Sequence, residues 1–210
     1  MLNLETLELK RGNHKSSEDG LCAMEAVAYF AGEPHTDRPK CASPVLTMYV
    51  QKLNDSMDDE TREKLKPYIM RLIGTNNGKE QEQERAKVLA WAAVTEFAPF
   101  ALEKSGLTEG AARLRNLPLY DWAAAAKAAE AAEAAARAAK AEEAETATAR
   151  AAWTAEAAAG AAGDAVWAAW SAGARTGAMT AWAAAAAAGA AETEVWDMAL
   201  SALDKALAVK

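Results

Sequence analysis

The sequence predicts an all-α protein, with a compact helical N-terminal region and alanine-rich helices packed on it. Helix start and stop signals recur up to Pro118, apolar residues follow them at helical spacing, and no proline occurs later. Residues 121–159 are dominated by Ala, Glu, Lys and Arg, which have high intrinsic helix propensity. This change in composition divides the chain into a predicted N-terminal region, 1–118, and a predicted alanine-rich region, 119–210.

The N-terminal arm and the first helix have separate signals. Residues 1–13 alternate weakly between apolar and polar side chains, which is typical of an extended arm or a short strand. We expect a helix over 21–31, started by a cap at Ser17 or Asp19 and ended by Gly32. Short polar side chains favour helix N-caps, and glycine commonly follows a helix C-terminus.

Prolines mark the next two helices. Ser43 followed by Pro44 predicts the start of a helix over 44–54, because serine caps well and proline suits the first helical position. Another helix is expected over 58–74, with a break or kink at Pro67. Proline removes a backbone donor and its ring clashes with the preceding turn.

The helices that follow are longer and then simpler in composition. A long amphipathic helix is predicted over 80–104 with a kink near Pro99, followed by a short helix capped by Thr108. Residues 121–159 form either one continuous helix or a hairpin. The last helix, over 193–209, carries an apolar stripe that we expect to dock against the main core, formed by Trp196, Leu200, Leu203 and Leu207. Small alanine-rich faces also allow copies of the chain to associate, so a homo-oligomer is a further hypothesis.

The charge of the chain excludes one class of partner. The formal net charge is −7, whereas non-specific binding to nucleic acid requires a basic surface. Glu5 and Glu8 interrupt the N-terminal residues, so no signal peptide is predicted there. The uncharged run 176–191 has 16 residues, which is short for a membrane span. We therefore expect a cytoplasmic protein with reduced cysteines and with neither nucleic-acid nor membrane partners.

Residues able to carry chemistry are concentrated in 11–44, a stretch that we call the cassette. It holds both histidines and both cysteines of the 210 residues. Zinc is one hypothesis, because His14, Cys22, His35 and Cys41 supply two imidazoles and two thiols, a set that tetrahedral zinc accepts. Their spacing lacks the short cysteine pair of zinc motifs, and a lone cysteine is commonly a buried apolar residue. The leading interpretation therefore has no cofactor, and structural zinc is its alternative.

A cysteine nucleophile is a second hypothesis. Cys22 follows Gly20-Leu21 at a predicted helix N-terminus, where the helix dipole lowers a thiol pKa. His35 or His14 would serve as the base, with Asp37 or Asn13 orienting it. No histidine occurs beyond position 35, although such enzymes usually take the base from a distant part of the chain.

The third hypothesis is an anion-binding mouth between two helix N-termini, where free N–H groups would hold a phosphate-like group. Lys15 and Lys40 would add positive charge, and the alternative is that the serines and acids only cap their own helices. The acidic members of the candidate set would work against an anion. The candidate ligand-binding residues are His14, Ser16, Ser17, Glu18, Cys22, Glu25, Asp37, Arg38 and Ser43.

The cassette segment GNHKSSEDGLCAMEAVAYFAGEPHTDRPKCASPV, with NDSM and LKPYIMRLIGT downstream, resembles a family of proteins from actinobacteria and their phages. That family pairs a similar opening with a variable Ala/Trp-rich helical tail. The resemblance covers about the first 75 residues and implies no established activity. Family members carry a bulky aromatic residue at the position of His35, which disfavours a four-ligand metal site.

The leading interpretation is a non-enzymatic binding or interaction protein. Through residues 13–43 it would sequester a small anionic ligand or a protein partner, as an accessory protein of a phage or bacterium. A cysteine-dependent hydrolase that uses Cys22 and a structural zinc protein are the alternatives.

Overall fold

The computed structural model describes residues 2–104, 106–142 and 192–210. These residues form helices and one isolated β-bridge between Leu9 and Leu21, with no sheet among them, so the all-α prediction is confirmed. In chain order the elements are α1 (Ala23–Phe30), α2 (Pro44–Ser56), α3 (Asp59–Arg62), the 3₁₀ turn η1 (Glu63–Leu65), α4 (Lys66–Leu72), α5 (Lys79–Ala92), the π-helical turn η2 (Ala93–Phe97), α6 (Ala98–Lys104), α7 (Thr108–Arg115), α8 (Trp122–Glu142) and α11 (Glu192–Leu207).

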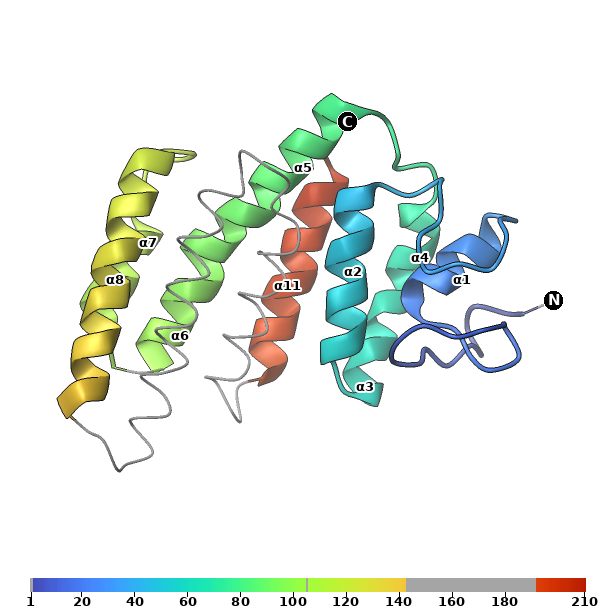
Figure 1. The fold of residues 1–210 in the computed structure, drawn as a ribbon, viewed down its shortest axis with the longest axis horizontal. Coiled ribbons are helices and arrows are strands. Elements are labelled where there is room, and N and C mark those ends of the chain that lie inside the picture. The colour runs from blue at the N-terminus through green and yellow to red at the C-terminus, as the bar shows by residue number, and fades with distance from the viewer. Residues whose placement is uncertain (1, 105, 143–191) are drawn as a thin grey trace.

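The helices are arranged so that the N-terminal loops and the α7–α8 pair lie at opposite ends of the molecule (Figure 1). Helix α7 packs against α6 and α8, and α1 packs against α2 and α4. Helix α11 lies between these two ends, against α5 on one side and α2 on the other (Figure 1).

One hydrophobic cluster joins the N-terminal region to the C-terminal helix. It runs from Leu7 to Ala206 and includes Trp196, whose exposed fraction is 1%. The Tyr49 hydroxyl of α2 donates to the Ala199 carbonyl of α11 at 3.1 Å, and the Tyr68 hydroxyl of α4 donates to Asp204 at 3.1 Å. The predicted docking of the last helix against the main core is confirmed.

The start of α1 differs from the prediction. Its N-cap is Cys22 rather than Ser17 or Asp19. Residues 16–19 form a separate turn, and Leu21 is held extended because Lys10 donates its N–H to the Leu21 carbonyl at 2.9 Å. The predicted stop is correct, since Gly32 has φ +71° and closes the helix with Glu33, whose N–H donates to the Ala28 carbonyl.

The two proline-marked helices match their signals in part. Ser43 caps α2 by accepting from the Leu46 N–H at 3.1 Å, and Pro44 occupies the first turn. The stretch predicted as one kinked helix over 58–74 is instead α3, η1 and α4. Pro67 lies in the first turn of α4, where a missing N–H costs no helical hydrogen bond.

The long helix predicted over 80–104 is α5, η2 and α6 in sequence. The kink was expected near Pro99, and the irregularity is instead the π-helical turn η2, just before that proline. The helix departs from regular α geometry there because Pro99 has no N–H to donate to the preceding turn. Thr108 is the first residue of α7 and does not cap it; Leu107 occupies that position. The continuation of the 121–159 prediction beyond α8, including the hairpin alternative, lies outside the described residues.

Candidate functional site

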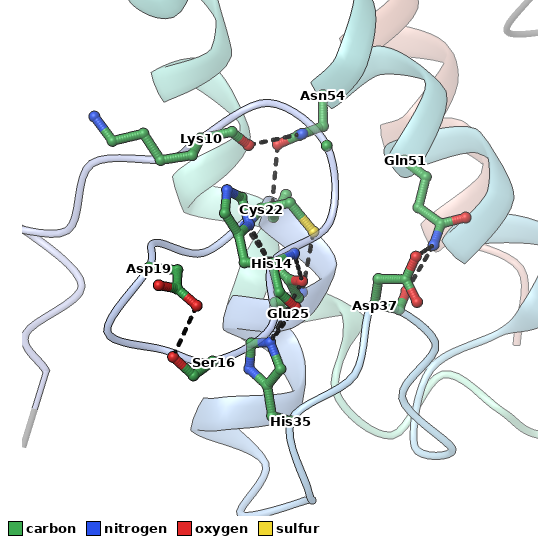
Figure 2. Close-up of polar contacts among 12 residues, drawn as sticks. Lys10, His14, Ser16, Asp19, Cys22, Glu25, His35, Asp37, Gln51 and Asn54 are labelled. Atoms are coloured by element: carbon green, nitrogen blue, oxygen red, sulfur yellow. Dashed lines mark hydrogen bonds and ion pairs between the residues drawn. The ribbon is translucent and has the colours of Figure 1, made fainter.

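The centre of the cassette is the carboxylate of Glu25, on the first turn of α1, with an exposed fraction of 1%. Its Oε1 accepts from the His14 N–H at 2.6 Å, and its Oε2 accepts from the Cys22 N–H at 2.8 Å. The His14 ring nitrogen Nδ1 lies 2.8 Å from Oε2. Figure 2 shows these side chains converging on Glu25, with His35 approaching from the next loop.

This convergence follows from a capping box. The Cys22 Sγ accepts from the Glu25 N–H at 3.4 Å while the Glu25 carboxylate accepts from the Cys22 N–H, the reciprocal pair usually formed by Ser or Thr with Glu. Cysteine in the place of serine hides this signal in the sequence. Gly20 then brings the loop close to the cap, at φ +125° and with no room for a Cβ beside Lys10.

His35 joins the second loop to the same cluster. Its Nε2 donates to the His14 carbonyl at 2.8 Å and lies 3.5 Å from Glu25 Oε1. The loops before and after α1 are therefore held together by hydrogen bonds to one buried acid and to its histidine neighbour.

The electrostatics of this cluster favour a carboxylate and a neutral thiol. Burial alone would raise the pKa of Glu25, but hydrogen bonds from the N–H groups of Cys22 and His14 and from the His14 ring lower it overall. Burial raises the pKa of the Cys22 thiol to about 12, opposed in part by the N–H of Glu25. A nucleophilic cysteine requires the opposite shift, so this geometry does not favour the hydrolase hypothesis.

The four potential zinc ligands are not brought together. His14, His35 and Cys22 surround Glu25, whereas the Cys41 N–H donates to Glu33 Oε1 at 2.8 Å. Within residues 2–104, 106–142 and 192–210, no group of three or more His, Cys, Asp or Glu side chains is placed to hold a metal ion. Burial, together with the nearby Glu33, raises the pKa of Cys41.

The two helix N-termini are already occupied. At α1, the Ala23 N–H donates to Asn54 Oδ1 at 3.1 Å, beside the Cys22–Glu25 pair. At α2, the Val45 N–H donates to Glu82 Oε2 at 3.0 Å. The protein's own side chains accept from N–H groups at both ends, so this geometry does not favour an anion-binding mouth between them.

The predicted ligand-binding residues separate into distinct groups. Ser16 donates to Asp19 at 3.0 Å, and Ser17 and Glu18 are exposed on the same turn. Ser43 is buried and donates its hydroxyl to Glu82 Oε2 at 2.6 Å. His14, Cys22 and Glu25 form the buried cluster described above. Asp37 and Cys22 line a small cavity, and Arg38 lines a larger one.

That cavity is a groove of about 750 Å³ between residues 38–42 and the outer face of α2, which we call the cationic groove. Arg38 and Lys40 on the loop and Lys52 on α2 line it, with Asp55 as the acidic residue of the lining. One oxygen of Asp55, Oδ1, accepts from the Gly12 N–H at 2.9 Å and from the Asn54 side chain at 3.1 Å. The remaining lining residues are Pro39, Ala42, Pro44, Thr47, Met48, Gln51 and Asn76.

Several contacts hold the loop in place beside α2. The Gln51 side chain donates to the Asp37 carbonyl at 2.8 Å and to its carboxylate at 3.0 Å (Figure 2). Asn76 donates to the Lys40 carbonyl at 2.9 Å. On the other side of the Gln51–Asp37 bridge, a smaller cavity of about 180 Å³ reaches Cys22. The Arg38 guanidinium takes part in none of the hydrogen bonds or ion pairs among the described residues.

Sequence reasoning identified Arg38 and Lys40 as cationic residues but missed the α2 wall. Met48, Gln51, Lys52 and Asp55 follow one another at helical spacing on its outer face. A methionine that shares this spacing with polar residues was the available signal in the sequence. Asn76 carried no comparable signal, because it meets the loop from another turn, 36 residues along the chain from Lys40.

Comparison of the chain with protein families, with characterised proteins and with solved structures finds no match. Its function must therefore be argued from the geometry of the site. Among the described helices, none combines the length and apolar character needed to cross a membrane.

Proposed function

We propose that the protein is a binding protein that holds a small anionic ligand in the cationic groove. The observation that supports this proposal is the local reversal of charge. Acidic residues outnumber basic ones by 30 to 23 in the whole chain, yet three basic residues and one acidic residue line the groove. A concave site whose charged lining is mostly of one sign concentrates ligands of the opposite sign.

The lining favours binding over turnover. The described residues around the groove include no His, Cys or Ser. Cys22 is buried behind the Gln51–Asp37 bridge, and Cys41 lies in the loop between the lining residues Lys40 and Ala42; burial raises the pKa of both thiols. We therefore infer sequestration of a ligand, with Arg38 offering a planar fork suited to carboxylate or phosphate oxygens.

The test is an NMR titration of ¹⁵N-labelled full-length protein with phenyl phosphate and with inorganic phosphate at low ionic strength. We expect at least one probe to shift the amide signals of Arg38, Lys40 and Asn76, and added salt to weaken the effect. The double variant Arg38→Gln/Lys40→Gln should weaken binding about tenfold or more, as expected for the loss of two charge-assisted contacts.

The matched control is Arg113→Gln/Lys127→Gln, which removes the same two charges from exposed positions on α7 and α8. This control should bind as the unmodified protein does. Equal weakening in both double variants would show an effect of net charge alone. That result, or the absence of any shift with either phosphate probe, would rule out the proposed function.

A further inference from the structure

The size of the cationic groove narrows the class of ligand. This inference rests on the proposed function, because it concerns the same site. A volume of about 750 Å³ lies in the range of sites that bury organic molecules, and a bare inorganic anion would leave most of it to water.

One wall of the groove is apolar. Ala42 has an exposed fraction of 2% and Pro39 is also buried, so both present a fixed surface. Pro44 and Met48 extend this surface outward along α2, and Met48 is 39% exposed. An exposed methionine beside prolines offers an adaptable apolar contact, because its thioether is flexible and polarisable.

Thr47 adds a polar atom to the same wall. Its exposed fraction is 5%, and its hydroxyl has no hydrogen-bond partner among the described residues. An unpaired buried hydroxyl carries a desolvation cost. A ligand acceptor would recover part of that cost if the Thr47 hydroxyl turned toward the groove.

From these features we infer that the ligand is an organic anion, with a carboxylate or phosphate group joined to an apolar ring or chain. The anionic group lies at Arg38 and Lys40, and the apolar body covers Met48 and Pro44. The basic side chains favour an anionic ligand over a neutral or cationic one, and contact with the apolar wall adds affinity that a bare anion does not gain.

The experiment compares three probes by NMR titration of the full chain. Phenyl phosphate carries both features, inorganic phosphate carries only the anion, and phenyltrimethylammonium carries a ring with the opposite charge. Phenyl phosphate should bind about tenfold or more tightly than either of the others, because burying a phenyl ring contributes a large apolar area.

A matched pair of variants locates the apolar contact. Met48→Gln should weaken phenyl phosphate binding about three- to tenfold and leave inorganic phosphate unchanged, because it replaces apolar surface with an amide of similar size. Met70→Gln is the control, since Met70 is 53% exposed on α4 and does not line the groove. Partial exposure of both side chains keeps either substitution compatible with folding.

Two outcomes would overturn the inference in different ways. Equal affinity for phenyl phosphate and inorganic phosphate, with no effect of Met48→Gln, would show that the apolar wall is unused, and the proposed anion site would stand. Failure of both phosphate probes to bind would remove the inference together with the proposed function.

Discussion

Glu25 connects three segments of the chain through one carboxylate. It caps its own helix with Cys22, accepts from the backbone and the ring of His14, and lies 3.5 Å from the His35 Nε2. These donors all depend on the buried Glu25 carboxylate. Removing its charge should therefore destabilise both loops around α1 as well as the helix itself.

Glu25→Gln should lower the free energy of unfolding at pH 7 by about 2–3 kcal/mol, because an amide NH₂ would face N–H groups that now donate to an oxygen. The pKa of Glu25 is lowered in the folded state, so its contribution is present above the unfolded pKa, about 4.3. It is lost as the pH falls through the folded pKa. Urea unfolding should therefore show a difference between the two proteins that shrinks below about pH 4.

The control for this prediction is Glu18→Gln, which removes the same charge from an exposed position in the preceding loop. It should change stability by less than about 0.5 kcal/mol. A Glu25→Gln protein as stable as this control would contradict the role assigned to the buried carboxylate.

At the scale of elements, α2 is capped partly by another helix. Glu82 of α5 accepts from the Ser43 hydroxyl at 2.6 Å and from the Val45 N–H at 3.0 Å. Its second oxygen accepts from Arg85 at 2.8 Å, and Arg85 is 1% exposed. The start of α2, which forms one wall of the cationic groove, is thus fixed by a carboxylate from 37 residues further along the chain.

We expect Glu82→Gln to destabilise the protein by about 1–2 kcal/mol, since it weakens a cap and leaves the buried Arg85 without its anion. Ser43→Ala should cost about 1 kcal/mol. Because both residues belong to one hydrogen-bond network, the double variant should cost less than the sum, by about 0.5 kcal/mol or more in a double-mutant cycle. Glu80→Gln, in the exposed first turn of α5, is the control. Strict additivity would show that Glu82 and Ser43 act independently.

Local sequence signals predicted the helix ends whose backbone groups form hydrogen bonds with residues close in the sequence. Ser43-Pro44 and Gly32 are such cases, because their partners lie within a few residues. The start of α1 was missed although its capping box is local, because cysteine replaces the usual serine at Cys22 and the pairing of Leu21 with Leu9 keeps the preceding residues out of the helix. The cationic groove was beyond prediction for a different reason. Its walls come from a loop, a helix face and a distant turn, and only their packing brings the basic side chains together.

At the scale of the whole molecule, α11 links regions that are far apart in the sequence. Its Ala199 carbonyl accepts from Tyr49, 150 residues earlier, and Trp196 is buried within the cluster that also contains Cys22. A core shared in this way predicts that loosening α11 weakens the N-terminal cassette as well. The Cys22 thiol provides a reporter, because it is 3% exposed and should react only when the structure opens.

Trp196→Ala should cost about 3–5 kcal/mol, the usual range for removing a large buried aromatic side chain. In a Cys41→Ser background, iodoacetamide at pH 8 should then modify Cys22 about a hundredfold to a few thousandfold faster than in the parent protein, since each 1.4 kcal/mol corresponds to a factor of ten. Leu119→Ala, at a position 74% exposed, is the control and should leave the rate unchanged. An unchanged Cys22 rate in Trp196→Ala, together with loss of helical circular dichroism, would mean that α11 and the cassette unfold separately. The shared core would then bring α11 and the cassette into contact without making their unfolding cooperative.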